Sequence, residues 1–389
     1  MTTLFGRQWT RTELEARAGN LAQVAGVTLV TLENGPSRGV RAVLFRTGSG
    51  LEFWVLVDRA FDIAKCQFGG IELGWQSPVG IRAPWLHDYH DEGSASFHRS
   101  FSGFIVTGGL DHTGPPFQES AGRYFAPDRP SIDQPLHGRL MATPGELIAY
   151  GHEWQGDRCI LFCEGVVRQV AVFGEHLVLT RRYETEVGSS SFTLRDHVRN
   201  QSFFKTPHML LYHINLGFPL LDHGAEFILP TRGIRWSFRD SRAEGIGYRF
   251  QTEPRQNCVE QVHIHDVVAN SAGRVCGALV NRKLMGSGLG IAVEFDHSRL
   301  PYLVQWQNLQ AGSYAVALEP STSHAMGRAH AEEHGELAWL DHGDERKYDL
   351  RFSVLAGAKE IDEFEAAVRS LVPDPPDPFI APQEPFGIC

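Results

Sequence analysis

The chain has 389 residues, of which 42% are hydrophobic and 21% charged, a composition typical of a globular protein rather than a disordered one. Its formal net charge is -10 with His neutral, which disfavours nucleic acid and anionic membranes as partners. No apolar run reaches the roughly 18 residues of a membrane span, and the N-terminus lacks the apolar core of a secretion signal. We therefore expect a soluble, cytoplasmic protein.

The N-terminal segment, residues 1–25, is predicted to form a helical addition to the main fold. Thr10 or Thr12 can cap a short helix whose first turn carries Glu13 and Glu15. Beyond this segment the apolar residues recur with a period of two, which is typical of strands. The predicted strands are, in chain order, residues 27–32, 40–46, 51–57, 159–172, 176–187, 191–200, 289–295, 303–307, 315–318, 337–340 and 348–354.

The C-terminal part is predicted to end in a helix and a tail. Residues 360–371 have the pattern of a short amphipathic helix, and residues 372–389 are Pro-rich and expected to be extended. No internal repeat or low-complexity linker divides the chain. We therefore predict a nearly all-β single domain over residues 1–389, whose 40 Gly and 21 Pro residues serve many turns.

Two long segments, residues 82–100 and 112–136, do not have the pattern of strands. They are rich in Pro and Gly and crowded with His and aromatic residues. Loops of this length are uncommon in a compact protein unless they build a site or are disordered. Their aromatic content favours order, and we expect them to supply aromatic side chains to a binding site.

The six cysteines are far apart in the sequence. Cys159 and Cys163 are expected on one face of a strand, which is compatible with a disulfide, a metal pair or two buried free thiols. The free thiols are favoured in a large intracellular chain, and no Cys-x-x-Cys zinc signature is present.

His213 and Glu319 are the two residues best placed for acid–base chemistry. His213 lies in the apolar stretch MLLYHINLGFPLL, where it is either a hydrogen-bonded core residue or a general acid in a partly buried cleft. Glu319 ends the predicted strand AVAL, where burial would raise its pKa toward that of a general base. The alternative for Glu319 is a helix cap or a surface ion pair with Arg328.

Six further polar residues are candidates for substrate binding: Arg59, His112, His137, Arg139, His265 and Asp266. Gly138, directly after His137, permits a close backbone approach, and the Arg guanidinium suits hydroxyls or carboxylates. If the strand is regular around Arg59, Asp58 and Asp62 share one face and Arg59 the other.

The pair His263 and His265 is also compatible with a metal site, because alternation places both rings on one strand face. No third or fourth ligand is evident, and no His-Glu-x-x-His motif is present. The chain also lacks a P-loop, a dinucleotide-binding glycine motif and a Gly-x-Ser-x-Gly elbow. We therefore predict neither a metal nor a cofactor.

Three short motifs occur in a fixed order: LHG at residues 136–138, YHINLG at 212–217 and LEP at 318–320. Together with DRAFDI, GWQSPVG, HGRL and LEPSTS, they resemble the aldose 1-epimerase (galactose mutarotase) superfamily over roughly residues 40–355. In detail the chain is similar to a bacterial epimerase-like branch of that superfamily. The second motif is shorter than the family's His-x-x-x-Asn-Leu pattern, because Ile214 alone separates His213 from Asn215.

The resemblance implies a galactose mutarotase-like β-supersandwich of large antiparallel sheets, with a sugar bound in a groove on one concave face. It implies an isomerase that interconverts the anomers of a free sugar without a cofactor. Glu319 would be the base and His213 the acid. His112, His137, Arg59 and Arg139 would bind hydroxyls, and the family's hydroxyl-binding Asp is best matched by the segment of His265 and Asp266.

Three alternatives remain open from the sequence. A non-catalytic sugar-binding module could keep the same groove. An isomerase or lyase could act on an oxidised sugar or uronate whose carboxylate binds Arg59 and Arg139. A metal-dependent sugar enzyme could use the face of His263 and His265. In each case the expected partner is a small-molecule sugar, and a homodimer is the expected assembly on general grounds.

Overall fold

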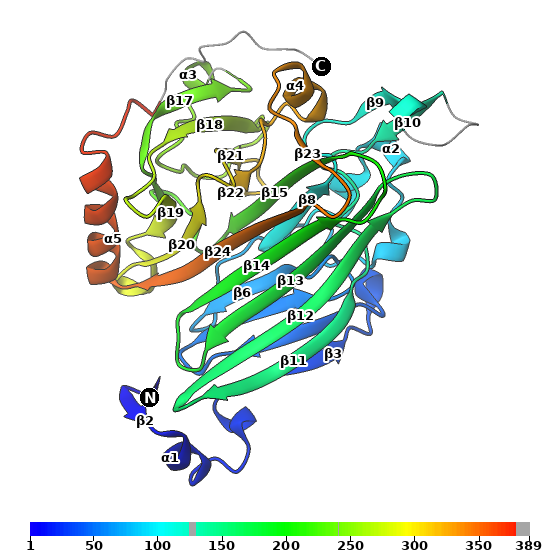
Figure 1. Cartoon of the computed structure of the whole chain (residues 1–389). Coiled ribbons are helices and arrows are strands. Elements are labelled where there is room, and N and C mark those ends of the chain that lie inside the picture. The colour runs from blue at the N-terminus through cyan, green and yellow to red at the C-terminus, as the bar shows by residue number, and fades with distance from the viewer. Residues whose placement is uncertain (124–129, 240, 379–389) are drawn as a thin grey trace.

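Two large antiparallel sheets make up most of the computed structural model, which describes residues 1–123, 130–239 and 241–378 (Figure 1). The first sheet has eight strands, in the spatial order β11 (Glu146–Gln155), β12 (Arg158–Val170), β13 (His176–Glu186), β14 (Ser191–Asn200), β24 (Glu345–Ala356), β20 (Leu289–Asp296), β19 (Arg274–Asn281) and β16 (Glu226–Ile228).

The second sheet has twelve strands and carries the candidate site. Its main path runs β17 (Thr231–Ser237), β18 (Gln261–Val267), β21 (Tyr302–Asn308), β22 (Ala315–Ser321), β15 (Thr206–Gly217), β8 (Ile105–Leu110), β6 (Asp62–Phe68), β5 (Leu51–Leu56), β4 (Arg41–Arg46) and β3 (Gly26–Thr31). Off this path, β23 (Ala338–Leu340) pairs with β15 and β7 (Ile71–Glu72) pairs with β6.

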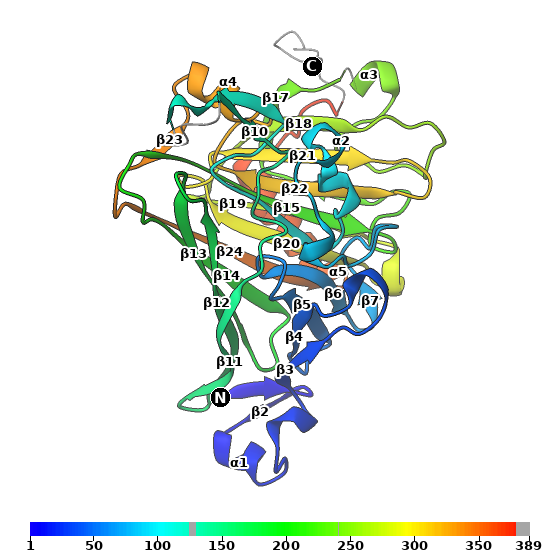
Figure 2. The ribbon, with the colours of Figure 1, turned by 90° about the vertical axis from the view of Figure 1, so that its right-hand side faces the viewer.

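Short elements decorate the sheets (Figure 2). At the N-terminus are β1 (Thr2–Leu4), β2 (Arg7–Trp9), α1 (Arg11–Glu15) and the 3-10 turns η1 (Leu21–Gln23) and η2 (Gly35–Ser37). Beside the second sheet are η3 (Pro84–Leu86), α2 (Asp91–Ser94), η4 (Ser96–Arg99), β9 (Phe117–Ser120), η5 (Ala121–Arg123) and β10 (Ser131–Gln134). The later elements are α3 (Ser241–Glu244), η6 (Leu284–Gly286), α4 (Arg328–Glu333) and α5 (Ala358–Leu371).

The inner faces of the two sheets share one hydrophobic core. Strands such as β12 and β14 alternate buried and partly exposed residues, so each contributes every second side chain to this core. A stack of aromatic rings crosses it, with Phe53 and Phe192 at 4.4 Å and Phe192 and Phe352 at 4.7 Å between ring centroids. Strand β15, like β8 and β22, is an exception, because all of its residues are buried. A continuous apolar run of this kind is typical of a strand that is covered on both faces of its sheet.

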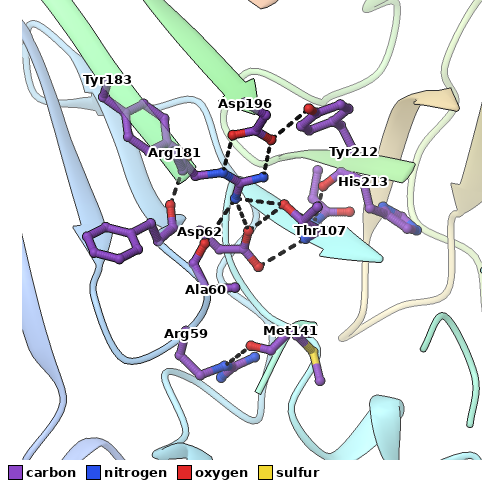
Figure 3. A network of polar contacts seen from close by, with 12 residues as sticks. Arg59, Ala60, Asp62, Thr107, Met141, Arg181, Tyr183, Asp196, Tyr212 and His213 are labelled. Atoms are coloured by element: carbon purple, nitrogen blue, oxygen red, sulfur yellow. Dashed lines mark hydrogen bonds and ion pairs between the residues drawn. The ribbon is translucent and has the colours of Figure 1, made fainter. Parts of the chain in front are cut away.

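A buried ion network ties the strands of the site to the opposite sheet (Figure 3). Arg181 on β13 donates to Asp196 at 2.7 and 2.8 Å, to Asp62 at 3.0 Å and to the Thr107 hydroxyl at 3.0 Å. Tyr212 on β15 donates to Asp196 at 2.7 Å. Because Thr107 and Tyr212 lie on neighbouring strands of the second sheet, the network fixes β8 and β15 relative to the first sheet.

The predicted elements agree with the structure in type along most of the chain. Thr10 caps α1 with a reciprocal capping box that includes Glu13, and the predicted C-terminal helix is α5. Cys159 and Cys163 are buried on one face of β12 as free thiols, and burial raises the pKa of Cys159 to about 12. The C-terminal tail is without regular structure over residues 372–378, and residues 379–389 lie outside the described part of the chain.

The prediction of a regular strand around Arg59 is wrong. Residues 58–61 form a turn in which Ala60 and Phe61 have φ angles of 50° and 56°. Asp58 and Asp62 therefore do not share a strand face: Asp58 pairs with Arg41, whereas Asp62 joins the buried network. Among the described residues, no helix is long and apolar enough to cross a membrane.

Candidate functional site

A pocket of about 560 Å³ lies on the outer face of the second sheet. Its floor is formed by side chains of β15, β22, β21, β18 and β17, and its walls by the segments around Trp75, Phe97 and Leu136 and by the loop after β22. Parts of both long segments singled out in the sequence, residues 82–100 and 112–136, line it.

One cross-strand row forms the centre of the floor. The register places His213 opposite Glu319, Glu319 opposite Val304, Val304 opposite Ile264 and Ile264 opposite Trp236. Directly opposed residues point to the same side of a sheet, so this row runs across five strands on the pocket face. The sheet thereby brings together two residues, His213 and Glu319, that are distant in sequence.

His213 and Glu319 are in direct contact at one end of this row. Nε2 of His213 lies 3.1 Å from Oε1 of Glu319, and each residue is only 4% exposed. Burial raises the pKa of Glu319 to about 8, and the nearby charge of Glu260 adds to the increase. Burial also lowers the pKa of His213 well below 6.5, assisted by His137. At neutral pH Glu319 is therefore protonated and uncharged, and the ring of His213 is neutral.

This protonation differs from the expected ionised Glu319 and protonated His213. An imidazolium needs acceptors for both ring N–H groups, yet Nδ1 of His213 has no hydrogen-bond partner among the described residues. The surface ion pair considered for Glu319 is also absent in the described structure, because Arg328 pairs with Asp111 and Glu119. Glu319 is instead a buried carboxyl group that faces the pocket.

His137 is the third titratable group of the pocket. Its Nδ1 accepts a hydrogen bond of 3.3 Å from the backbone N–H of Gly114, so the neutral ring carries its proton on Nε2. Burial lowers the pKa of His137 to about 4, which keeps the ring neutral. The close approach expected at Gly138 is present, since a Cβ atom there would lie 2.4 Å from the carbonyl oxygen of His112.

Aromatic rings surround the His213 imidazole. The ring centroids of Phe101 and Trp306 lie 4.7 and 5.4 Å from it, and His137 lies at 6.1 Å. Trp75 packs against Phe101 at 5.2 Å. These rings exclude water from the acid–base pair and offer flat apolar faces of the kind on which sugar rings stack.

Glu260 is a pocket residue that sequence reasoning missed. Its Oε2 accepts a hydrogen bond of 2.8 Å from the indole N–H of Trp306, and its other oxygen has no partner among the described residues. Strand alternation in the sequence indicates the pocket face to which Glu260 binds, because it places Trp306 and Val304 on the face of β21 opposite Gln305. The same alternation on β18 separates His263 and His265 from the pocket face.

The polar lining of the pocket is acidic or neutral. Among the described residues, no Lys or Arg lines it. The polar side chains that do so are Ser77, His98, His137, His213, Glu260, Asn308, Ser313 and Glu319. The site therefore offers no cation for a carboxylate or phosphate group of a ligand.

Arg59 lies outside the pocket, contrary to expectation. It is 3% exposed and donates to three backbone carbonyl groups, those of Met141 at 3.0 Å, Arg82 at 2.8 Å and Ser100 at 3.0 Å. Its guanidinium joins the loops that form the wall of the site, as Figure 3 shows for Met141. Arg59 therefore supports the loops without facing a ligand.

His112 and Arg139 also lie outside this pocket. Nε2 of His112 lies 3.0 Å from the carbonyl oxygen of Pro115, and burial lowers the pKa of His112 to about 3. Arg139 donates to Gln134 Oε1 at 2.6 Å and to the Asp133 carbonyl at 2.7 Å, and it lines a separate concavity.

Neither His265 nor Asp266 contributes to the pocket: strand alternation turns His265 away from it, and Asp266 lies near the end of β18, outside the lining. His265 points to the inner face, where Nε2 lies 2.8 Å from Gln305 Oε1, and Asp266 forms an ion pair with Arg232 at 3.2 Å. His263 also lies on the inner face, beside the Ser237 hydroxyl at 2.9 Å. No group of three or more His, Cys, Asp or Glu residues in the described chain is arranged to hold a metal.

Comparison with solved structures identifies the fold. A candidate aldose 1-epimerase from Klebsiella pneumoniae subsp. pneumoniae superposes with a TM-score of 0.80 at 21% identity, over 90% of each chain. A galactose mutarotase-like protein from Clostridium acetobutylicum gives 0.54 at 13% identity, over 84% of this chain and 98% of its own. A galactose 1-epimerase from Lactobacillus acidophilus gives 0.52 at 11%, over 84% and 98%.

These similarities confirm the expected galactose mutarotase-like sandwich of large antiparallel sheets. No curated protein matches the sequence. A family model described as a domain of unknown function, DUF4432, matches residues 37–354. The chain therefore belongs to the DUF4432 family and has the fold of the aldose 1-epimerases.

Proposed function

We propose that this protein is an aldose 1-epimerase that interconverts the anomers of a sugar without a negative charge. The observation that carries the proposal is the 3.1 Å contact between His213 and Glu319 in an aromatic pocket whose described lining contains no Lys or Arg. Anomer exchange needs one acid and one base at the anomeric centre, and the two groups share one proton. The similarity of the fold to that of a galactose 1-epimerase supports the proposed activity by analogy.

The proposed reaction starts with the proton on Glu319. Glu319 donates this proton to the ring oxygen O5 while His213 accepts the proton of the C1 hydroxyl, so the C1–O5 bond breaks and C1 becomes a carbonyl carbon. Rotation about the C1–C2 bond then presents the other face of C1. His213 returns its proton to the carbonyl oxygen, Glu319 takes the proton of the O5 hydroxyl, and the C1–O5 bond re-forms.

His137 and Glu260 would bind the sugar during this reaction. The neutral His137 ring offers an N–H donor at Nε2, and the free oxygen of Glu260 can accept a bond from a hydroxyl. Trp306 and Phe101 would pack against the apolar face of the sugar ring. These groups replace Arg59, Arg139, His112, His265 and Asp266 as the proposed contacts.

The composition of the pocket disfavours an oxidised sugar or a uronate as substrate. A buried carboxylate needs a cation or several donors, and Glu260 would repel it. Arg59 and Arg139, which were considered as carboxylate ligands, both point elsewhere and are engaged with backbone carbonyl and amide oxygens. A neutral sugar avoids this cost.

Exchange NMR on a panel of aldoses, ketoses, uronic acids and sugar phosphates tests the proposal. We expect anomer exchange above the spontaneous rate on at least one neutral aldose, and a loss of about 10²-fold or more in Glu319→Gln and His213→Asn. The exposed Glu33→Gln is the matched control for removal of a carboxylate. Acceleration confined to uronic acids, or no acceleration by the folded protein on any sugar, would overturn the proposal; the second result would favour a binding module.

A further inference from the structure

The pocket extends well beyond the acid–base pair. Along the central row, Trp236 lies four strands from His213. Because neighbouring strands are about 4.8 Å apart, the Cα atoms of these two residues are roughly 19 Å apart along the sheet. A single sugar ring bound at His213 and Glu319 cannot reach Trp236. The far part of the pocket therefore remains available to another portion of the ligand.

This far part is an apolar arm. We define it by the six lining residues that cluster around Trp236, namely Trp236, Phe238, Val262, Val304, Ala325 and Met326. Trp236 and Val304 are 6% and 1% exposed, whereas Phe238, Val262 and Met326 are partly exposed to the pocket. Beneath them Ile264 completes the row, so both floor and wall are hydrocarbon.

Apart from His213 and Glu319 at one end of the central row, the polar groups of the pocket lie outside this row. The register places Phe238 beside Val262 and Val262 opposite Trp306, which separates the arm from the next row, where Glu260 neighbours Asn308. Within the arm, the indole N–H of Trp236 is the single side-chain group able to form a hydrogen bond. Arg239 stacks over Phe238 at 5.1 Å but is not part of the described lining.

We propose that the apolar arm is a second subsite, which binds an alkyl or aryl substituent carried by the sugar whose anomeric carbon lies at His213 and Glu319. The inference rests on the proposed function for the position of the sugar ring. A second sugar ring fits the arm less well, because its hydroxyl groups would be buried without partners. An apolar group loses no hydrogen bonds there and gains from leaving water.

Binding of matched sugar ethers tests the subsite without requiring turnover. The probes are the 3-O-, 4-O- and 6-O-hexyl ethers of D-glucose, D-galactose and D-mannose, the corresponding methyl ethers, and the disaccharides maltose, isomaltose and melibiose. Titration would follow tryptophan fluorescence, since Trp75, Trp236 and Trp306 line the pocket. Burial of a methylene is worth about fourfold in affinity, so at least one hexyl ether should bind 10-fold or more tightly than its methyl counterpart.

Substitutions in the arm should remove this gain selectively. Trp236→Ala tests the end of the row, and Val262→Thr and Met326→Gln test partly exposed positions where folding is less at risk. Each should reduce the hexyl-over-methyl ratio severalfold and leave the affinity for the methyl ether unchanged. The 89% exposed Phe203, changed to Ser, is the control and should leave the ratio unaltered.

Two outcomes would overturn the inference: equal binding of hexyl and methyl ethers at every position, or tighter binding of a disaccharide than of any hexyl ether. Failure of the proposed function is distinguishable from both. If the hexyl ethers bind through Trp236 but their anomers do not exchange faster, the subsite stands and the epimerase assignment is wrong.

Discussion

Tyr212 and His213, adjacent on β15, serve opposite faces of the same sheet. The Tyr212 hydroxyl donates to Asp196 at 2.7 Å inside the Arg181 network (Figure 3), and His213 meets Glu319 at 3.1 Å in the pocket. The inter-sheet network thus fixes the backbone from which the candidate catalytic His projects. Stability and site geometry are coupled at this strand.

Removal of Arg181 should destabilise the fold strongly. Arg181→Met leaves the carboxylates of Asp62 and Asp196 buried without their cation, at a cost of about 3–5 kcal/mol. Urea denaturation measures the change. The exposed Arg195, which pairs with Glu184, is the control, and Arg195→Met should cost less than about 1 kcal/mol. Equal effects of the two substitutions would contradict the structural role of the network.

The Glu319→Gln variant should become more stable relative to the wild type as pH rises. The folded-state pKa of Glu319, about 8, lies above the ordinary carboxyl value of 4.5, so its contribution to stability is complete below pH 4.5 and is lost as pH rises through 8. Between pH 4.5 and pH 8, the free energy of unfolding of the variant should increase relative to that of the wild type by about 1.4 kcal/mol per pH unit. Urea titrations at pH 5.5 and 7.5 check this, and a constant difference would argue against a buried protonated carboxyl.

The pH dependence of anomer exchange should report the same group. The rate should fall above pH 8, where Glu319, with a pKa of about 8, loses the proton it donates. Because the charge of Glu260 helps to raise this pKa, Glu260→Gln should move the fall in rate to lower pH. NMR exchange rates from pH 5 to 10 measure both curves, and coincident curves would exclude the coupling.

Acid should unfold the protein through its buried neutral His residues. Burial lowers the pKa of His137, His208 and His263 to about 4 and that of His265 to about 3, below the ordinary imidazole value of 6.5. Their contribution to stability is present above pH 6.5 and is lost as pH falls through the folded-state values, since the unfolded chain binds more protons. Circular dichroism should show cooperative unfolding between pH 6 and 4.

A single His substitution tests this explanation of acid unfolding. His208 lies 2.9 Å from the carbonyl oxygen of Leu110 and 2.8 Å from the Tyr348 hydroxyl, and it is remote from the pocket lining. His208→Gln should lower the dependence of stability on pH by about 1.4 kcal/mol per unit in the acid range. An unchanged slope would mean that His208 is not part of the effect.

Gly138→Ala should damage both stability and the site. Gly138 has a φ of 80°, and a Cβ atom would lie 2.4 Å from the His112 carbonyl oxygen and 2.5 Å from that of Gly109. We expect a loss of about 2–4 kcal/mol and slower anomer exchange, because the adjacent His137 must shift. Gly19→Ala, with open space around it, is the control. Thermal denaturation and exchange NMR check the two effects.

The fold and the central pair were predictable from the sequence, whereas most of the binding residues were not. Period-two alternation predicted strands such as β13 and β14, and motif order singled out His213 and Glu319. Arg59 and Asp266 failed as predictions because Arg59 lies in a turn and Asp266 forms an ion pair with Arg232 outside the pocket. Glu260 was missed because its role arises from Trp306 on a different strand.

The order of strands in the first sheet constrains when the protein can fold during synthesis. Strand β24 is the last strand in the described part of the chain, yet it lies between β14 and β20 in the middle of that sheet (Figure 1). Until residues 345–356 leave the ribosome, strands β11–β14 cannot form one continuous sheet with β16, β19 and β20. A nascent chain can therefore hold both His213 and Glu319 while the sheet behind them is still split in two.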